Sequence, residues 1–111
     1  MEPKIKKITP FLKFFLFSNI VGICLAPFGI YLHEKHINNK RTINHEKIHW
    51  KQQMEMLIVF FYLWYFIEWL IKLIYNRNAY YSISFEREAY ENDGNSEYLI
   101  NRKNYNWIKY L

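Results

Sequence analysis

Apolar residues dominate three stretches of the chain, and polar clusters separate them. Residues 8 to 22 predict a first helix that ends near Gly22. The next apolar run, FGIYL at residues 28 to 32, follows Pro27 and precedes the polar segment HEKHINNKR, a pattern typical of a short strand. The beginning of the chain therefore predicts a helix followed by a strand.

The polar segment after this strand predicts a reversal of the chain. Asn38 and Asn39 favour a turn, because their side chains bond easily to nearby backbone groups. We expect the chain to return as a second short strand around Arg41 to Ile43. The two strands would form a β-hairpin that leads into the next helix.

The longest regular stretch runs from about Asn44 to Tyr75 and contains neither Gly nor Pro. Its residues are good helix formers, so one long helix or two abutting helices should form. The polar cluster Asn76-Arg77-Asn78 ends this stretch.

Two shorter helices are expected in the C-terminal third. Residues 82 to 92 offer Ser82 or Ser84 as an N-cap. A turn signal at residues 92 to 95 precedes a last short helix from Ser96 past Leu99.

These elements predict a mostly helical α+β fold with three to five helices and a short β-hairpin. A chain of 111 residues is long enough for a single domain, residues 1 to 111, with one modest core. With 51% hydrophobic and 21% aromatic residues, disorder is not expected. The single cysteine, Cys24, cannot form an internal disulfide, and we expect a buried thiol.

Charge and hydropathy raise the question of a membrane. The net charge of +5 is spread along the chain, which suits anionic lipid headgroups better than nucleic acid. Phe14 to Leu32 approaches the length of a spanning helix but contains Pro27. Met54 to Tyr75 is long enough, yet Glu68 lies inside it with Lys72 as a partner one turn later. Attachment to the cytoplasmic membrane, an integral membrane protein and a soluble cytoplasmic protein remain the three alternatives.

The segment NHEKIHWKQQ contains the pattern HExxH. His45 and His49 are four residues apart, so a helix places both imidazoles on one face, where they can bind one metal ion. Glu46 stands beside the first histidine, where a carboxylate can accept a proton from metal-activated water. With this composition, about 0.01 such patterns are expected by chance.

A zinc site of this kind needs a third protein ligand and an open fourth position. SFEREAY offers Glu86, 37 residues after His49, with the small Ala89 one turn later on the same predicted helix. Glu88 lies about 200° around that helix from Glu86, so only one of the two glutamates can face a metal. The spacing to Ala89 favours Glu86.

HExxH and ExxA together resemble the gluzincin zinc metallopeptidases. The resemblance covers about residues 28 to 92 and is closest to minimal gluzincin scaffolds and to the catalytic cores of membrane-embedded HExxH/ExxA peptidases. It implies Zn²⁺ bound by His45, His49 and Glu86, with Glu46 as the catalytic base. The implied reaction is hydrolysis of a bond in a peptide or protein substrate, and the strand near Ile30 to Leu32 would be the edge strand that pairs with the substrate.

One position departs from the membrane families that share ExxA. Those families place Asp after the alanine, and this chain has Tyr90, so the carboxylate that orients a ligand histidine must come from elsewhere. Asp93 and Glu55 are the two candidates. Donors for the oxyanion are also open, with Tyr80, Tyr81, Tyr90 and Tyr98 suitable by chemistry.

Two function hypotheses follow. The first is a zinc metallopeptidase, with a peptide or protein substrate, no nucleic-acid partner and a membrane surface as a further candidate partner. The second is a catalytically inactive membrane-associated binding or scaffold protein that keeps a zincin-like fold.

Overall fold

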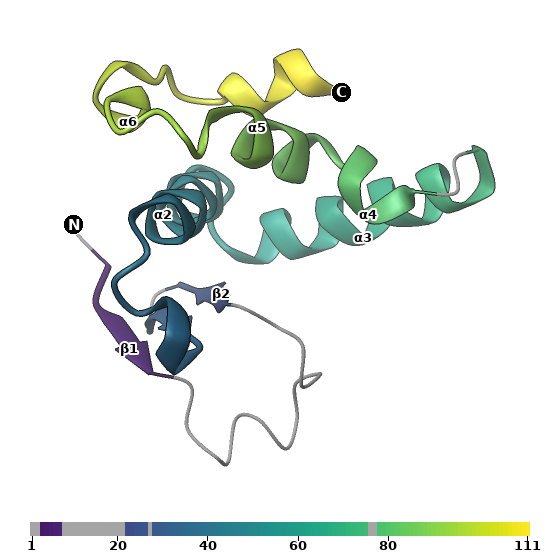
Figure 1. Cartoon of the computed structure of the whole chain (residues 1–111). Coiled ribbons are helices and arrows are strands. Elements are labelled where there is room, and N and C mark those ends of the chain that lie inside the picture. The colour runs from purple at the N-terminus through teal and green to yellow at the C-terminus, as the bar shows by residue number, and fades with distance from the viewer. Residues whose placement is uncertain (1–2, 8–21, 27, 76–77) are drawn as a thin grey trace.

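A computed structural model describes residues 3–7, 22–26, 28–75 and 78–111. The predicted helix over residues 8 to 22 lies outside this part except for Gly22, which begins a strand. Along the described chain the elements are β1 Ile5–Lys7, β2 Gly22–Leu25, β3 Gly29–Leu32, η1 Glu34–His36, α2 Lys40–Glu55, α3 Val59–Tyr75, α4 Ala79–Ser82, α5 Ser84–Asn92, α6 Tyr98–Asn101 and η2 Asn106–Tyr110. The mostly helical α+β class is therefore confirmed (Figure 1).

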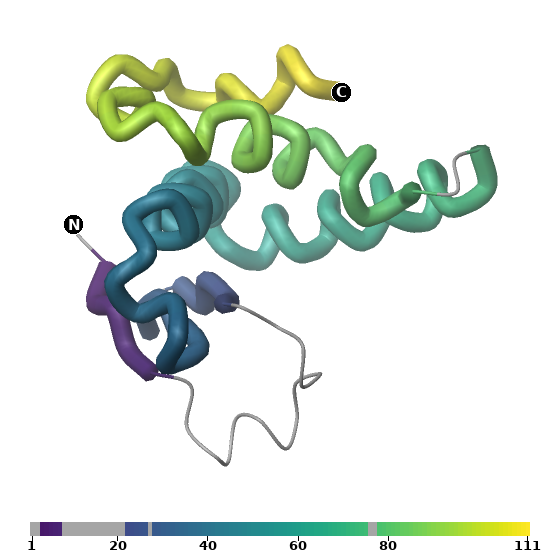
Figure 2. Tube along the Cα trace, viewed as in Figure 1, coloured from purple at the N-terminus to yellow at the C-terminus, as the bar shows by residue number. Residues whose placement is uncertain are grey.

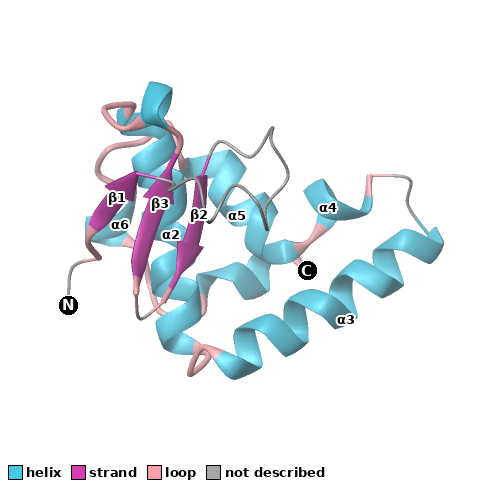
Figure 3. Cartoon of the chain, turned by 90° about the horizontal axis from the view of Figure 1, so that it is seen from below, coloured by secondary structure: helices cyan, strands magenta, loops and turns pink. Residues whose placement is uncertain are grey.

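The strands form one small sheet in the order β1-β3-β2. The predicted strand at residues 28 to 32 is confirmed as β3, which runs parallel to β1 and antiparallel to β2. The turn between β2 and β3 is closed by a hydrogen bond of 2.7 Å from the Phe28 N–H to the Leu25 carbonyl. The hairpin partner of β3 therefore precedes it in the chain (Figure 3).

The predicted second strand around Arg41 to Ile43 is wrong, because these residues form the first turn of α2. Asn39 is the N-cap of this helix, and its side-chain oxygen accepts hydrogen bonds from the backbone N–H groups of Arg41 and Thr42. The same side-chain chemistry that favours a turn also begins a helix, and here the helix forms.

The long apolar stretch forms two helices, α2 and α3, that meet at an angle of 110°. The break contains Leu57 and Ile58, whose φ values of 53° and 63° are unusual for residues with side chains of this size. Ile58 is half-buried and packs against the core between α2 and the sheet, a contact that acts against the cost of the left-handed backbone. Neither residue carries a sequence signal for a break.

Two apolar clusters hold together the elements whose course Figure 2 traces. The first lies between the sheet and α2 and consists of Cys24, Ala26, Ile30, Leu32 and Trp50. The second joins α3, the start of α5 and η2 through Phe61, Ile83, Phe85 and Trp107. The thiol of Cys24 is buried, as expected. Helix α5 thus lies between the C-terminal segment and the pair α2 and α3.

Helix α5 obtains its N-terminal cap from α3. The predicted caps Ser82 and Ser84 are wrong, since the N-cap residue is Ile83 and its side chain makes no capping bond. Ser84 is instead the first helical residue, and both its N–H, at 2.8 Å, and its hydroxyl donate to the Glu68 carboxylate. Glu68 is buried, so it does not form the surface pair with Lys72 that the spacing suggests. Lys72 donates to the Ser82 carbonyl at 3.1 Å.

No single described helix is long and apolar enough to cross a bilayer, and α2 and α3 reach that length and hydropathy only when joined across their 110° bend. Of the stretch Phe14 to Leu32, the described part forms strands β2 and β3.

Candidate metal centre

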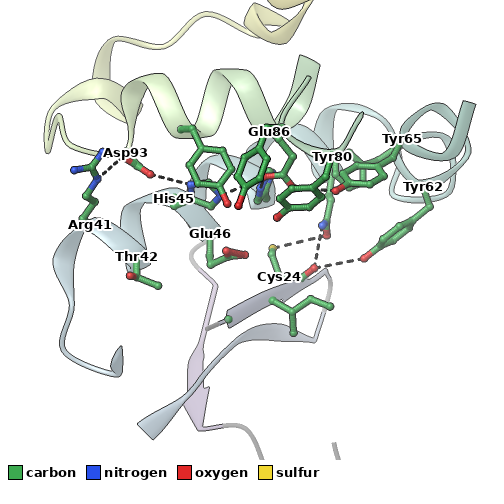
Figure 4. A pocket seen from close by; sticks show the side chains of 17 residues that line it. Cys24, Arg41, Thr42, His45, Glu46, Tyr62, Tyr65, Tyr80, Glu86 and Asp93 are labelled. Atoms are coloured by element: carbon green, nitrogen blue, oxygen red, sulfur yellow. Dashed lines mark hydrogen bonds and ion pairs between the residues drawn. The ribbon is translucent and has the colours of Figure 1, made fainter. Parts of the chain in front are cut away.

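Three side chains from α2 and α5 converge on one point (Figure 4). One ligand atom from each of His45, His49 and Glu86 lies within 4.8 Å of the other two. The Oε1 atom of Glu86 is 3.4 Å from the Nε2 of His45 and 3.0 Å from the Nε2 of His49. Tetrahedral ligands at about 2.1 Å from zinc lie about 3.4 Å from each other. The two distances from Glu86 are close to this separation, and the three ligand atoms can therefore share one ion after a small adjustment.

Local geometry explains most of this convergence. His45 and His49 are one turn apart on α2, so their rings lie on one face and meet edge to face, with centroids 4.8 Å apart. Ala89 follows Glu86 by one turn on α5 and is fully buried, where α2 and α5 pack on each other. As predicted from the spacing, Glu86 faces the histidines, and Glu88 points elsewhere.

Both imidazoles are oriented by a hydrogen bond at Nδ1. The Nδ1 of His45 is 2.9 Å from the Asp93 carboxylate, and the Nδ1 of His49 is 2.7 Å from Oε1 of Gln52. An acceptor at each Nδ1 holds a proton there, so Nε2 is the nitrogen that a neutral imidazole would offer to a metal ion. Two nitrogen donors and one carboxylate oxygen form a donor set that zinc prefers.

Of the two carboxylates proposed to orient a histidine, the structure places Asp93 at the site. Its second oxygen accepts from the Nε of Arg41 at 2.6 Å, which fixes the carboxylate between α2 and the end of α5. Glu55 lies on the opposite side of α5 and binds Arg102. Asp93 is the C-cap residue of α5, and its distance from His45 depends on how the two helices pack, which explains why spacing alone left both candidates open.

The pKa values of His49 and Glu86 are shifted in the directions that favour a positive charge beside the Glu86 carboxylate. Burial lowers the pKa of His49, but the charge of Glu86 and the hydrogen bonds from Glu86 and Gln52 outweigh it and raise the pKa to about 10. Burial raises the pKa of Glu86, and the charge of His49 with the hydrogen bonds of both histidines brings it well below its usual range. A proton on His49 thus occupies the position where a metal ion would balance the carboxylate.

Glu46 lies beside the three ligand atoms and does not belong to their group. It is buried and lines the same pocket, with its Cγ facing Gly22 of β2. Burial raises the pKa of its carboxyl more than the two histidines lower it. A carboxylate with a raised pKa next to a metal is suited to accept and return a proton.

The tyrosines proposed as oxyanion donors separate into two groups. Tyr80, Tyr81 and Tyr90 line the pocket, and the ring of Tyr90 lies 4.5 Å from that of His45. Tyr98 does not, because its hydroxyl donates to Glu88 on the other side of α5. Tyr65 was missed, although its hydroxyl donates to Oε2 of Glu86 at 2.9 Å.

Tyr65 and Gln52 are the residues that sequence reasoning overlooked. Tyr65 belongs to the aromatic run of α3, where a hydroxyl near the site cannot be told from packing. Gln52 had a weak signal, since it follows His49 by three residues and so lies on the same face of α2.

The pocket in front of the cluster has a volume of about 830 Å³ and extends to strand β2. The prediction that Ile30 to Leu32 forms the edge is wrong, since β3 lies between β1 and β2 in the described sheet. Gly22, Ile23 and Cys24 of β2 line the pocket instead. The Cys24 carbonyl accepts from Nε2 of Gln53 at 3.0 Å, so it points away from β3.

Comparison with known proteins gives no relative for this site. The chain matches no family model, no curated protein and no solved structure. What the site can do is therefore inferred from its own residues, namely two imidazoles and a carboxylate around one point, with a second carboxylate beside them.

Proposed function

We propose that this protein is a zinc-dependent metallopeptidase. The observation that carries the proposal is the convergence of His45, His49 and Glu86, with Glu46 beside them at the wall of a pocket. Both Nε2 atoms and the Glu86 oxygen are directed at one point, which is the arrangement of a catalytic zinc site with an open position. The resemblance to gluzincins agrees with this arrangement.

Bound zinc supplies Lewis acidity, which makes water a competent nucleophile at neutral pH and polarises a peptide carbonyl. The chain supplies the proton transfers. Glu46 accepts a proton from the attacking water and delivers it to the nitrogen of the cleaved bond, so that the amine departs neutral. Burial raises the pKa of Tyr80, and Glu86 adds to the shift, so this hydroxyl stays protonated and can donate to a developing oxyanion, whereas the Tyr65 hydroxyl already donates to Glu86.

Strand β2 gives a place for the substrate backbone. Cys24 directs its carbonyl away from β3, where Gln53 and Tyr62 already bind it. The carbonyl of Gly22, two residues earlier, faces the same side and lies at the pocket wall. An extended peptide that pairs with this end of β2 would pass in front of the cluster, and main-chain pairing does not require a particular sequence.

The test is metal content followed by cleavage. Purified protein should hold one zinc ion per chain and cut a mixed peptide library. Glu46→Gln should retain zinc and lose activity by about 10²- to 10⁴-fold, because only the proton carrier is removed. Glu34→Gln, an exposed glutamate in η1, is the matched control and should keep both properties. Activity that survives in Glu46→Gln would contradict the proposal.

The location we propose is the surface of the cytoplasmic membrane, with α3 lying in the lipid interface. The exposed large apolar side chains of α3 include Val59, Phe60, Phe66, Leu70 and Ile74. At 100° per residue the whole exposed apolar set of α3, which runs around the helix from Tyr62 to Tyr75, covers about 220°, whereas one protein partner usually covers a stripe of about 100°. Glu68 and Lys72 lie outside this arc, so lipid can contact all of it.

Sedimentation with vesicles tests this location. Wild-type protein should bind vesicles that contain anionic lipid. Leu63→Lys with Leu70→Lys, both inside the exposed arc, should release it, and Ile100→Lys on α6 should not. Equal binding by all three proteins would exclude α3 as the contact.

The exposed face of α3 also favours a second function. A membrane-associated binding or scaffold protein would need this surface and the fold, and it would not need turnover. Stoichiometric zinc without cleavage of any peptide would support this alternative over the peptidase.

A further inference from the structure

A buried chain of hydrogen bonds runs from His49 to the C-terminal segment. It begins at the Nδ1 of His49, passes through the amide of Gln52 and the carboxylate of Glu88, and reaches the guanidinium of Arg102. Arg102 also binds Glu55. Gln52 and Glu88 are fully buried, and the side chain of Arg102 is only 2% exposed, so water cannot replace these contacts.

The orientation of the Gln52 amide is determined by its neighbours. Its Nε2 lies 3.1 Å from the carbonyl of Phe85 and 2.8 Å from the carboxylate of Glu88. A carbonyl and a carboxylate can only accept, so both require the NH₂ group of the amide on this side. The oxygen of Gln52 must therefore face His49, where it can only accept a proton from Nδ1. The Nε2 of a neutral His49 is left as the free ligand atom.

Both oxygens of Glu88 in turn accept hydrogen bonds from further donors. Arg102 approaches it with two nitrogens, and the hydroxyl of Tyr98 donates to it as well. Arginine remains protonated under all ordinary conditions. Glu88 is thus a permanent acceptor, and the orientation of Gln52 depends on a cation that enters from the C-terminal segment.

We propose that Gln52, held by Glu88 and Arg102, is a positioning residue that fixes the Nε2 of His49 as a metal ligand. This inference rests on the proposed metal centre, and it adds that residues 98 to 106 control the centre without touching it. The C-terminal segment lies over the side of α5 opposite to α2, the helix that carries the two histidines (Figure 1).

The chain offers a matched pair of variants for the test. Gln52 and Gln53 are adjacent on α2 and both buried, and each binds through both ends of its amide. Gln52→Met keeps the volume and removes the acceptor at Nδ1, so affinity for Co²⁺, followed by its d–d absorption, should fall by 10- to 100-fold. Gln53→Met should leave Co²⁺ affinity unchanged. Equal affinity in the two variants would overturn the proposal.

A second measurement does not depend on metal binding. In the metal-free protein, the Nδ1 proton of His49 should give a downfield NMR signal that exchanges slowly with water, because it is buried and bonded to Gln52. This signal should be lost in Gln52→Met and kept in Gln53→Met. Its absence from the wild type would overturn the inference, whereas a wild type that shows the signal and binds neither Zn²⁺ nor Co²⁺ would overturn only the proposed function.

Glu88→Gln tests the outer part of the chain. The substitution keeps the shape and allows residue 88 to donate as well as accept, so the amide of Gln52 is no longer held in one orientation. We expect a loss of Co²⁺ affinity smaller than that of Gln52→Met and at least threefold. Wild-type affinity in Glu88→Gln would show that Gln52 acts without Glu88 and Arg102.

Discussion

Glu86 and Glu88 are two residues apart on α5, both are buried, and both have a pKa below the usual range of a glutamate. Burial acts against ionisation at both positions, and cationic neighbours overcome it. The partners of Glu86 are imidazoles, which can release a proton and bind a metal ion in its place. The partner of Glu88 is Arg102, which cannot.

The type of cation beside a buried carboxylate therefore determines whether that carboxylate can bind a metal ion. A buried glutamate that binds arginine is not available as a metal ligand, since no metal ion displaces the guanidinium from its hydrogen bonds. A glutamate held by histidines can exchange a proton for Zn²⁺ at little cost, because the same nitrogens serve as ligands. One helix thus carries a structural contact and the candidate site on its two sides.

The largest expected effect is the loss of stability when Glu88 is removed. Glu88→Ala leaves the buried Arg102 without its main partner, and we expect a loss of about 3 to 5 kcal/mol in the free energy of unfolding. Urea denaturation of the metal-free protein measures this loss. Glu86→Ala should cost clearly less in the same experiment, because His49 can lose its proton. Equal losses would break the distinction between the two carboxylates.

The two pairs should also differ in their response to pH. The pKa of His49 rises from 6.5 in the unfolded chain to about 10 in the fold, so its stabilising contribution is complete below pH 6.5 and is lost as pH rises through 10. Glu86, with a lowered pKa, contributes above pH 4.5 and loses its contribution as pH falls further. Thermal unfolding of the chelator-treated protein should therefore show stability that declines from pH 6.5 to 10.

The control for this profile is the double variant His49→Gln, Glu86→Gln, which lacks the pair. Its stability should decline less than that of the wild type across the same range, since Arg102 and Glu88 keep their charges there and only other buried acids with raised pKa values, such as Glu46 and Cys24, still contribute. An identical decline in this variant would assign the pH dependence to other groups.

A change at the start of α5 should affect both sides of the helix alike. Glu68→Ala removes the acceptor of both Ser84 donors, and we expect a loss of about 2 kcal/mol in the free energy of unfolding. Calorimetry measures the loss, and zinc affinity should fall with it because Glu86 is in the first turn. Ser84→Ala, which removes one of the two donors, should cost less. A loss of zinc affinity without a loss of stability would contradict a capping role.

The smallest expected effect concerns the orientation of Glu86. Tyr65→Phe removes one hydrogen bond to Oε2 and leaves Oε1 with the histidines, so zinc affinity should fall by less than 10-fold. Isothermal titration of the metal-free protein measures the change. Tyr62→Phe, on the same helix and bonded to Cys24, is the matched control and should bind zinc as the wild type does. A larger loss in the control would remove Tyr65 from the site.

Features that depend on near neighbours in the chain were predictable. The four-residue spacing of His45 and His49 places both on one face of any helix. The angle between Glu86 and Glu88 on α5 likewise excludes one of them, and the ExxA spacing identified which. Strand β3 followed from its apolar run and the residues around it.

Features that depend on packing were not predictable. The break at Leu57 and Ile58 has no Gly or Pro, and the half-buried Ile58 packs there against the core between α2 and the sheet. Asn39 supports both a turn and a helix start, and only the surrounding fold selects the helix. The position of β3 in the middle of the sheet came from β1, whose pairing is distant in the chain.

The sequence by itself determined the helical class, the candidate ligands and the face of each helix that carries them, because these follow from periodicity and from the chemistry of single residues. Only the tertiary structure decided that Asp93 and Gln52 orient the two imidazoles, that Tyr65 binds Glu86 and that β2 borders the pocket. The physical reason is distance. A hydrogen bond requires atoms within about 3 Å, and helix packing, which no local pattern encodes, sets that separation.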